Sequence, residues 1–427
     1  MLKKLNLSSF WQTYIAVLLS FVTSRLMLQT DLLMIAPLSQ FAVAAFAVPN
    51  HIMIIDMVVA MALGPVVSVL VSQENQLSRK SALIKMCMGF TLAVSILLTI
   101  IGLLIYPLIV DYIVSDHSVR ALAQVAIFWM TISIPIRMVM FISNMCLFAC
   151  SKNKEVIVIN GIAMIANGVL DYLFIYVFHY HFSGVYIATF IVSLLEALFL
   201  LKTLRDHIGT LPIGFFKIQW IKKLLGMVGS EWWRIFSWQM EGFIVLAVLA
   251  SQLNWLGILS VFSVTQPFLL LVMMPLIALM RTSAMKIAAI DVKNSVMASW
   301  NLLQPILTKV LIATVFIGLL IMVIAYPLGI YGYHLNQFQL NWWLIFCGVV
   351  GITLPIFVYG SLLRSCYQAC HQFNTIACVE IMTAWLLFMP LLWFGLQQAS
   401  PFLFFGAFAV REAVIAIFLR YVLVKAA

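Results

Sequence analysis

Charged side chains are scarce along this sequence of 427 residues. Only 9% of the residues are Asp, Glu, Lys or Arg, whereas 64% are hydrophobic. A soluble globular protein carries about 25% charged residues, because its surface must interact with water. So few charges exclude a water-soluble globular protein, and they indicate an integral membrane protein instead.

Apolar stretches long enough to cross a bilayer recur along nearly the whole chain. A spanning helix needs ~20 mostly apolar residues, and the short alternating strands of a membrane β-barrel are absent from the pattern. Because hydrocarbon cannot hydrogen-bond exposed backbone groups, helices are the remaining spanning structure. The sequence therefore predicts an all-α integral membrane fold with twelve transmembrane helices. The expected spans are 10–36, 45–72, 84–110, 122–148, 155–178, 184–204, 227–251, 256–284, 303–328, 341–364, 374–396 and 401–423.

Patterns typical of enzymes, disulfide frameworks and metal sites are also missing. We find no His-rich ligand cluster, nucleophile elbow or phosphate-binding loop, so we predict no catalytic residues and no cofactor. The seven cysteines are odd in number, and none lies in a predicted external loop, which argues against a disulfide framework. Cys366, Cys370 and His371 are close in sequence, but we interpret them as a cytoplasmic helix end and predict no metal site.

The net charge of +10 comes from basic residues that are distributed between the apolar segments, so it does not indicate nucleic-acid binding. With a cytoplasmic N-terminus, the external loops contain only Arg120, beside Asp111 and Asp116. This asymmetry follows the positive-inside rule and predicts that both termini are cytoplasmic. The basic residues assigned to the cytoplasmic side are Lys3, Lys4, Arg79, Lys80, Lys85, Lys152, Lys154, Lys202, Arg205, Lys217, Lys222, Lys223, Lys286, Lys293 and Lys425.

The two halves of the chain resemble each other at an offset of 220 residues. The matching residues are Tyr106-Pro107 with Tyr326-Pro327, Pro135 with Pro355, and Ala149-Cys150 with Ala369-Cys370. Since each half contains six predicted spans, the two copies have the same orientation, which predicts a parallel internal repeat. We expect an N-terminal lobe at 1–206, a cytoplasmic linker with an interfacial helix at 207–226, and a C-terminal lobe at 227–427. Two such bundles are typical of transporters.

Ionisable residues inside the predicted spans are candidates for function, because each costs ~2.5 kcal/mol or more to insert. Asp31 lies in the first span, and Asn167 and Asp171 share one face of the fifth span at i,i+4 spacing. Two buried carboxylates close together favour binding of a proton or a sodium ion. The alternative is that Asp31 and Asp171 form fixed ion pairs with Arg25 or Arg137.

The remaining ionisable residues in the spans allow several interpretations. Glu241 is the strongest candidate for a coupling or substrate residue in the C-terminal half, and Glu231 and Arg234 have a spacing that allows them to pair. Adjacent Arg411 and Glu412 point in different directions on a helix and need other partners. Further candidates for substrate binding or ion pairing are Arg25, Arg137, Arg411 and Asp56, and Glu196 is a further candidate for function.

Four segments resemble the multidrug and toxic compound extrusion (MATE) family of the wider flippase and exporter superfamily. They are "TDLLMIAPLSQFAVAAFAVP" at 30–49, "NGVLDYLFIYVFHYHFSGVYIAT" at 167–189, Glu241 in "SWQMEGFIVLAVLA", and "YGSLLRSCYQA" at 359–369. The resemblance implies two lobes in a V shape and cation-coupled export across a bacterial inner membrane. It also implies an N-lobe cation site formed by Asp31, Asn167, Asp171 and Thr189, with Asn144 as a further member, and a C-lobe role for Glu241.

The function that we expect from the sequence is therefore transport by a membrane-embedded monomer. The coupling ion is H⁺ or Na⁺, and the substrate is a drug-like organic cation or a dedicated metabolite. The alternative is a flippase for a lipid-linked saccharide or another substrate with an anionic headgroup, because buried arginines would suit such a group. A membrane enzyme is the second alternative, but no catalytic motif supports it.

Overall fold

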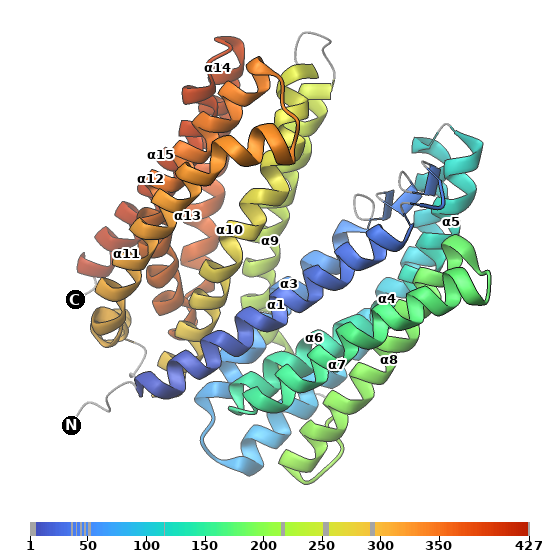
Figure 1. Ribbon diagram of the computed structural model, residues 1–427. Helices are drawn as coiled ribbons and strands as arrows, with labels where there is room; N and C mark the ends of the chain where they lie inside the picture. Colours follow the sequence, from blue (N-terminus) through green and yellow to red (C-terminus); the bar gives the residue numbers. More distant parts are fainter. Residues whose placement is uncertain are drawn as a thin grey trace. The chain divides into compact units, whose positions relative to one another are not determined.

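The computed structural model describes residues 6–425 apart from 36, 40, 43–44, 47, 50–52, 115, 215–217, 251–255 and 291–294. All regular secondary structure in these residues is helical (Figure 1). The chain divides into two compact units, of which one is Leu7–Val228 and the other contains Gly229–Ala427. We refer to them as the N-terminal lobe and the C-terminal lobe, and each is described by itself.

Six apolar helical segments build the described part of the N-terminal lobe. They are α1 (Leu7–Ile35), α3 (Ile54–Gln73), α4 (Leu77–Ile113), α5 (His117–Ile132) with α6 (Ile134–Ala149), α7 (Asn153–Tyr172) with the π-helical turn η1 (Leu173–Val177), and α8 (His181–Ile208). The axis bends by 48° between α5 and α6. Pro135 is one of the first two residues of α6, and its ring lacks the N–H that would continue the hydrogen bonds of α5, so the helix breaks at Ser133.

Six helical segments also build the C-terminal lobe within the described residues. They are α9 (Ile218–Ala250), α10 (Leu256–Ala288), α11 (Val296–Pro327) with η3 (Leu328–Gly332), α12 (Gln337–Ala369), α13 (Phe373–Thr383) with η4 (Ala384–Phe388) and α14 (Met389–Gln397), and α15 (Pro401–Lys425). The backbones of α11 and α12 approach closely at two glycines, since a Cβ on Gly318 would lie 2.2 Å from the carbonyl oxygen of Gly351. Small residues permit such close packing of membrane helices.

In the predicted linker at 207–226, the described helical residues belong to the ends of two long helices. Helix α8 continues to Ile208 and ends at Gly209, which adopts the left-handed conformation that glycine tolerates (φ 71°). Helix α9 then begins at Ile218 and runs without a break to Ala250. The residues 218–226 therefore belong to the same helix as the seventh predicted span.

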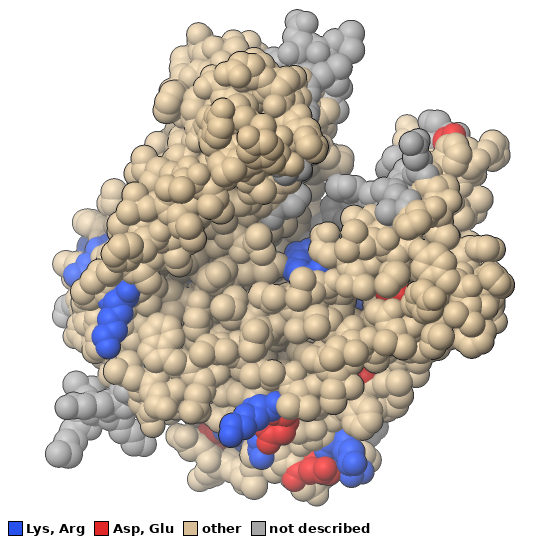
Figure 2. All heavy atoms as spheres, in the orientation of Figure 1, with Lys and Arg blue, Asp and Glu red and all other residues tan. Residues whose placement is uncertain are grey.

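The structure confirms the all-α membrane fold. Nine helices among the described residues are long and apolar enough to cross a membrane, and the bent pair α5–α6 makes a tenth. Helices α3 and α9 occupy the two remaining predicted spans, 45–72 and 227–251. Most of the face shown in Figure 2 is uncharged, and several basic and acidic side chains lie together at its lower edge. Large apolar residues such as Leu104 and Val323 are exposed, as expected of surfaces that contact lipid.

The internal repeat is visible in the backbone. Ser151 and His371, 220 residues apart, adopt the same left-handed conformation, with φ of 60° and 61°. The turns around them also have the same hydrogen bonds, because the amides of Cys150 and Cys370 each bond to the carbonyl four residues earlier. The repeat predicted from side-chain identities is thus matched by identical turns at the corresponding ends of α6 and α12.

Candidate functional site

Three helices of the N-terminal lobe bring together four of the predicted site residues. Helix α1 packs against α7 and α8, and α7 packs against α8. Asp31 lies in the last turns of α1, Asn167 and Asp171 in the last turns of α7, and Thr189 in α8. We call these four residues the Asp31–Asp171 cluster. Its members are separated by up to 158 residues in sequence, so only the packing of the helices makes them neighbours.

Asn167 connects the two carboxylates of the cluster. Its amide nitrogen donates to Asp31 Oδ1 at 2.6 Å and to Asp171 Oδ2 at 2.8 Å. Thr189 Oγ1 donates to the other oxygen of Asp31 at 3.4 Å. Asp31 is 6% exposed, and Asn167 and Asp171 are fully buried. One amide group therefore holds two aspartates within a short distance of each other in a site closed to water.

Within the described residues, the cluster has unsatisfied oxygen atoms and no counter-ion. Among the described residues, no ion pair involves Asp31 or Asp171, so the expected alternative of a fixed pair with Arg25 or Arg137 is not present there. Asn167 Oδ1 and Asp171 Oδ1 are buried and have no hydrogen-bond partner. Unpaired buried carboxylates are costly unless a proton or a cation neutralises them. The oxygen atoms of the cluster therefore fit either occupant.

Among the described hydrogen bonds, none links the other predicted residues of the N-terminal lobe to this cluster. Asn144 on α6 is 5% exposed and makes no hydrogen bond to the cluster within the described part of the chain. Arg25 is exposed, and the guanidinium group of Arg137 donates to the carbonyl of Met130 at 3.2 Å. Asp56 belongs to α3, but its side chain lies outside the described residues.

Glu241 in the C-terminal lobe is bound to Arg411. The guanidinium group of Arg411 on α15 donates to Glu241 Oε2 at 2.5 Å, and its carbon lies 5.2 Å from the centre of the Phe388 ring. Ser237 Oγ, 3.4 Å away, donates to the second oxygen of Glu241. In turn, Trp385 Nε1 donates to Ser237 at 2.9 Å. Glu241 thus has a fixed counter-ion, unlike the two aspartates of the N-terminal lobe.

A second group of buried charges alternates in sign across four helices of this lobe. Arg234 on α9 contacts Glu231 at 2.6 Å and Glu380 on α13 at 3.0 Å. Arg364 on α12 also binds Glu380, and it binds Glu412 on α15 at 2.9 Å. We call these five residues the arginine–glutamate chain. The predicted pairing of Glu231 with Arg234 is confirmed, and Arg411 and Glu412 have separate partners, as predicted.

Several polar residues of these clusters were not predicted from the sequence. Arg364 is embedded in the quoted segment "YGSLLRSCYQA", and a buried charge in a span was the signal that could have identified it. Gln368 Nε2 donates to Glu231 at 3.3 Å. Tyr186, one turn before Thr189 on α8, is 6% exposed, and its hydroxyl group has no hydrogen-bond partner among the described residues.

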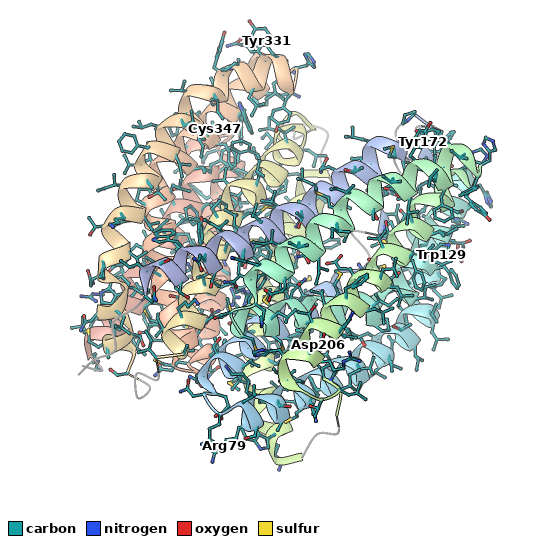
Figure 3. All side chains as sticks on the ribbon, turned by 60° about the horizontal axis from the view of Figure 1, so that its bottom comes forward. Arg79, Trp129, Tyr172, Asp206, Tyr331 and Cys347 are labelled. Atoms are coloured by element: carbon teal, nitrogen blue, oxygen red, sulfur yellow. The ribbon has the colours of Figure 1, made fainter. Side chains whose placement is uncertain are left out.

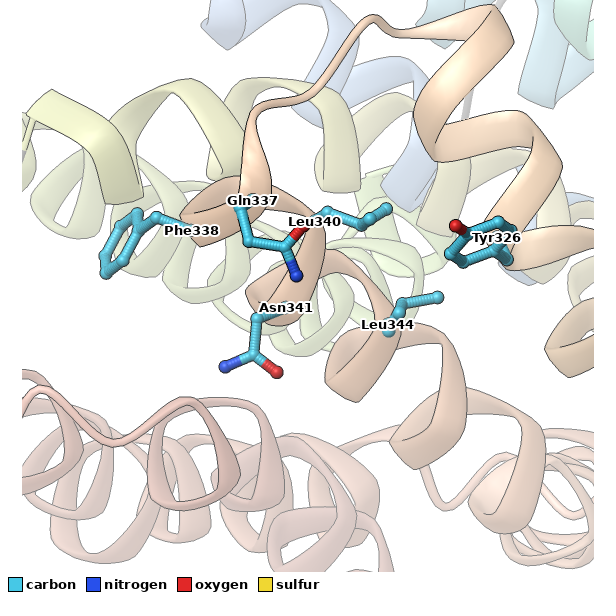
Figure 4. Close-up of a pocket in the computed structure, with 6 residues that line it drawn as sticks. All are labelled: Tyr326, Gln337, Phe338, Leu340, Asn341 and Leu344. Carbon is cyan, nitrogen blue, oxygen red and sulfur yellow. The ribbon is translucent and has the colours of Figure 1, made fainter.

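The described surface also has a pocket that contains none of these residues. It has a volume of about 490 Å³ and lies where α11 ends and α12 begins (Figure 4). None of its lining side chains carries a charge, so it offers no group that could couple to a cation. The lining residues are Tyr326, Gln337, Phe338, Leu340, Asn341 and Leu344. In the part of the chain that the structure describes, no group of three or more His, Cys, Asp or Glu residues could hold a metal ion.

Comparison with known proteins agrees with this architecture. Residues 16–173 match the sequence model of the MatE family. No curated protein sequence matches the chain.

Solved structures match nearly the whole chain. A MOP superfamily transporter from Pyrococcus furiosus, described as having a binding pocket of reverse polarity that suggests a different function, is 13% identical, with a TM-score of 0.85 over 97% of this chain and 95% of that chain. An outward-facing multidrug resistance MATE transporter is 14% identical, with a TM-score of 0.86 over 98% and 96%. A Vibrio cholerae MATE transporter in the bent form is 15% identical, with a TM-score of 0.84 over 98% and 96%.

At these sequence identities, the likeness to the solved structures shows the fold alone. The match to the MatE model is a similarity of sequence. That match covers α3, α4, α5, α6, α7 and most of α1, so it includes Asp31, Asn167 and Asp171. Together, the two comparisons show that residues 16–173 are similar to the MatE family and that the whole chain has the fold of solved MATE and MOP superfamily transporters.

Proposed function

We propose that this protein is a cation-coupled antiporter that exports a small organic molecule in exchange for H⁺ or Na⁺. The observation that carries the proposal is the Asp31–Asp171 cluster, in which two buried carboxylates share one amide group and have no ion-pair partner in the part of the chain that the structure describes. The similarity of residues 16–173 to the MatE family supports the same conclusion.

The coupling follows from the cost of two adjacent negative charges. In a site of low dielectric constant, two bare carboxylates repel each other, so Asp31 and Asp171 titrate as a pair and retain one proton or bind one cation between them. The empty cluster and the loaded cluster then differ in net charge. If the helices of the lobe pack differently in these two states, ion binding determines which side of the membrane the substrate site faces.

A flippase for an anionic headgroup is the alternative, and the pairing of three buried arginines favours the exporter over it. Arg234, Arg364 and Arg411 are all paired with glutamates. An anionic substrate would have to displace these carboxylates, which are themselves held by several hydrogen bonds. The paired arginines are therefore better explained as structural than as substrate ligands, and they leave a drug-like cation or a dedicated metabolite as the expected cargo.

We further infer that the protein works as a monomer in a bacterial inner membrane with both termini in the cytoplasm. The basic residues between the spans support this orientation under the positive-inside rule. Arg79 and Asp206 lie near the same end of the N-terminal lobe, away from Tyr172 (Figure 3). This end is therefore assigned to the cytoplasm.

Transport by the purified protein in liposomes tests the proposed function. Uptake of a panel of organic cations and anionic metabolites is measured under a proton gradient alone, a sodium gradient alone, and no gradient. Accumulation of at least one small molecule under one ion gradient is expected. Movement of a lipid headgroup with no dependence on either gradient would instead support the flippase.

The orientation is tested by labelling with a thiol reagent that cannot cross the membrane. All seven native cysteines are free, and Cys378 is exposed, so the background protein carries Ser in place of Cys378 and of half-buried Cys150. New cysteines replace exposed Ser118 or Ser78, one at a time. In intact cells, the cysteine at position 118 should react and that at position 78 should not. Reaction at position 78 alone would reverse the orientation.

A further inference from the structure

Three asparagines of α7 form a row of polar contacts with α1. Asn153, Asn160 and Asn167 are spaced by seven residues, which brings them to the same side of the helix. Each contacts a polar side chain of α1, with Asn153 donating to Thr13 at 2.9 Å and Asn160 lying 2.8 Å from Ser20. The Asp31–Asp171 cluster is the last member of this row and the only one to which the proposed function assigns a role.

The middle member of the row contains a further carboxylate. Asn160 satisfies both ends of its amide group when its oxygen accepts from Ser20 Oγ. Its nitrogen then donates to Glu196 Oε1 on α8 and to the carbonyl of Val156, both at 3.1 Å. Ser20, Asn160 and Glu196 are 7%, 5% and 6% exposed. A glutamate is thus buried between α1, α7 and α8, and the hydrogen-bonding groups found around it among the described residues are neutral.

No cation neutralises Glu196 within the described residues, since none of the ion pairs there includes it. The basic groups on the packed helices α1, α4, α5, α6 and α7 are exposed, partly exposed or bound elsewhere. Arg25 is exposed, Lys85 is partly exposed, Arg120 donates to the carbonyl of Val114, Arg137 donates to Met130, and Lys152 pairs with Glu155. The acidic groups nearest along the row are Asp31 and Asp171. Burial without a partner strongly disfavours the charged carboxylate.

We propose that Glu196, together with Ser20 and Asn160, is a second proton-binding site of the N-terminal lobe. When the site is loaded, the carboxyl group is neutral and its carbonyl oxygen accepts the hydrogen bond from Asn160. When the proton leaves, the Asn160 N–H group stabilises the carboxylate that remains. The binding of a proton at Glu196 is inferred from the geometry of the site alone. A part for this proton in the coupling cycle rests on the proposed function.

The ligands favour a proton over a metal cation. A sodium ion needs several oxygen atoms that point toward it, as carboxylate and carbonyl groups provide. At this site, the amide group of Asn160 directs its N–H group at the carboxylate, and its oxygen is occupied by Ser20. A sodium ion beside Glu196 would therefore meet a positively polarised N–H group, whereas a proton on the carboxyl group is compatible with it.

The position of Glu196 suggests what the bound proton does. Glu196 follows Thr189 by seven residues on α8, which corresponds to about 10 Å along the helix. In the same direction, Asn160 precedes Asn167 on α7 and Ser20 precedes Asp31 on α1. Glu196 therefore lies between the Asp31–Asp171 cluster and the end of the lobe where α1 and α7 begin, which is the end assigned to the cytoplasm. A proton that leaves the cluster toward the cytoplasm passes this site.

Infrared spectroscopy of the purified protein tests whether Glu196 holds a proton. A protonated carboxyl group has a carbonyl stretch that a carboxylate lacks, and ¹³C-labelled glutamate separates its band from those of the aspartates. We expect a labelled band at neutral pH that is lost in Glu196→Gln and kept in the matched control Glu155→Gln, whose side chain is partly exposed and paired with Lys152. In Asn160→Ala, the band should move to higher frequency, because its hydrogen bond is removed. Identical spectra for the wild type and Glu196→Gln would overturn the proposal.

Transport measurements then test the role in coupling separately. Under a proton gradient, the transport rate of Glu196→Gln should fall by at least about tenfold, since a positioned proton carrier has been removed. The transport rate of Glu155→Gln should equal that of the wild type. An unchanged transport rate in Glu196→Gln would overturn the role of Glu196 in coupling, but it would not overturn the proton-binding site. If neither ion gradient drives transport by the wild type while the glutamate band persists, the proposed function fails and the proton-binding site stands.

Discussion

Replacing either Asp31 or Asp171 with asparagine is expected to reduce gradient-driven transport to the level of protein-free liposomes. Asparagine matches aspartate in size but cannot be ionised, so the cluster no longer alternates between a loaded and an empty state. The fold should be kept, because each substitution replaces a buried carboxyl group that forms no ion pair with any described residue. The rate of uptake under a proton gradient and under a sodium gradient measures the effect, and elution from a sizing column measures folding.

The matched control for these variants is Asp206→Asn in the same lobe. Asp206 is exposed and pairs only with its neighbour Arg205, so its substitution should leave transport unchanged. Binding of the substrate can persist in the cluster variants, because the exchange of the ion is the step that has been removed. Transport near the wild-type rate in both Asp31→Asn and Asp171→Asn would refute the assignment of the coupling site and direct attention to Glu241.

Replacing Arg364 with glutamine should produce the largest loss of stability. Arg364 binds Glu380 and Glu412, and Glu412 has no other ion-pair partner among the described residues. Removing one partner of a buried ion pair typically costs about 3–5 kcal/mol, because the remaining charge is left uncompensated. We therefore expect a clearly lower unfolding temperature in detergent for Arg364→Gln than for the wild type.

A second substitution distinguishes loss of charge from loss of packing. Adding Glu412→Gln to Arg364→Gln removes the uncompensated carboxylate, so the double variant should recover part of the lost stability. The matched control is Arg205→Gln, because Arg205 forms an exposed pair that contributes little. An unfolding temperature of Arg364→Gln equal to that of the wild type would contradict a structural role for the arginine–glutamate chain.

The membrane fold could be predicted from the sequence because each span is a local property of about twenty residues. The length and hydropathy of one segment determine whether it crosses the bilayer, so the spans follow without knowledge of their neighbours. The boundary at 207–226 was harder, since Ile218–Gly226 can form either a separate surface helix or the start of α9. The continuity of that helix depends on contacts that the local pattern does not contain.

The contacts of the candidate site are likewise of two kinds, some between residues close in sequence and some between residues far apart in sequence. The i,i+4 relation of Asn167 with Asp171 and the pairing of Glu231 with Arg234 follow from helical geometry. The contact of Asn167 with Asp31 joins residues 136 positions apart, and only the resemblance to a family indicated it. Similarly, the need of Arg411 for a distant partner was predictable, but the choice of Glu241 depends on how α9 packs with α15.

The two lobes hold their charges differently, and this has a consequence for the response to membrane voltage. A potential of 100 mV does about 2.3 kcal/mol of work on each elementary charge that crosses it. Paired glutamates and arginines that move together carry little net charge, so the C-terminal lobe contributes little to this work. Voltage then acts on the ion bound in the N-terminal lobe and on the cargo. Exchange of one proton for a monovalent cation is electrically silent, whereas exchange for a neutral molecule generates a current. The current carried by the transporter therefore reports the charge of its substrate.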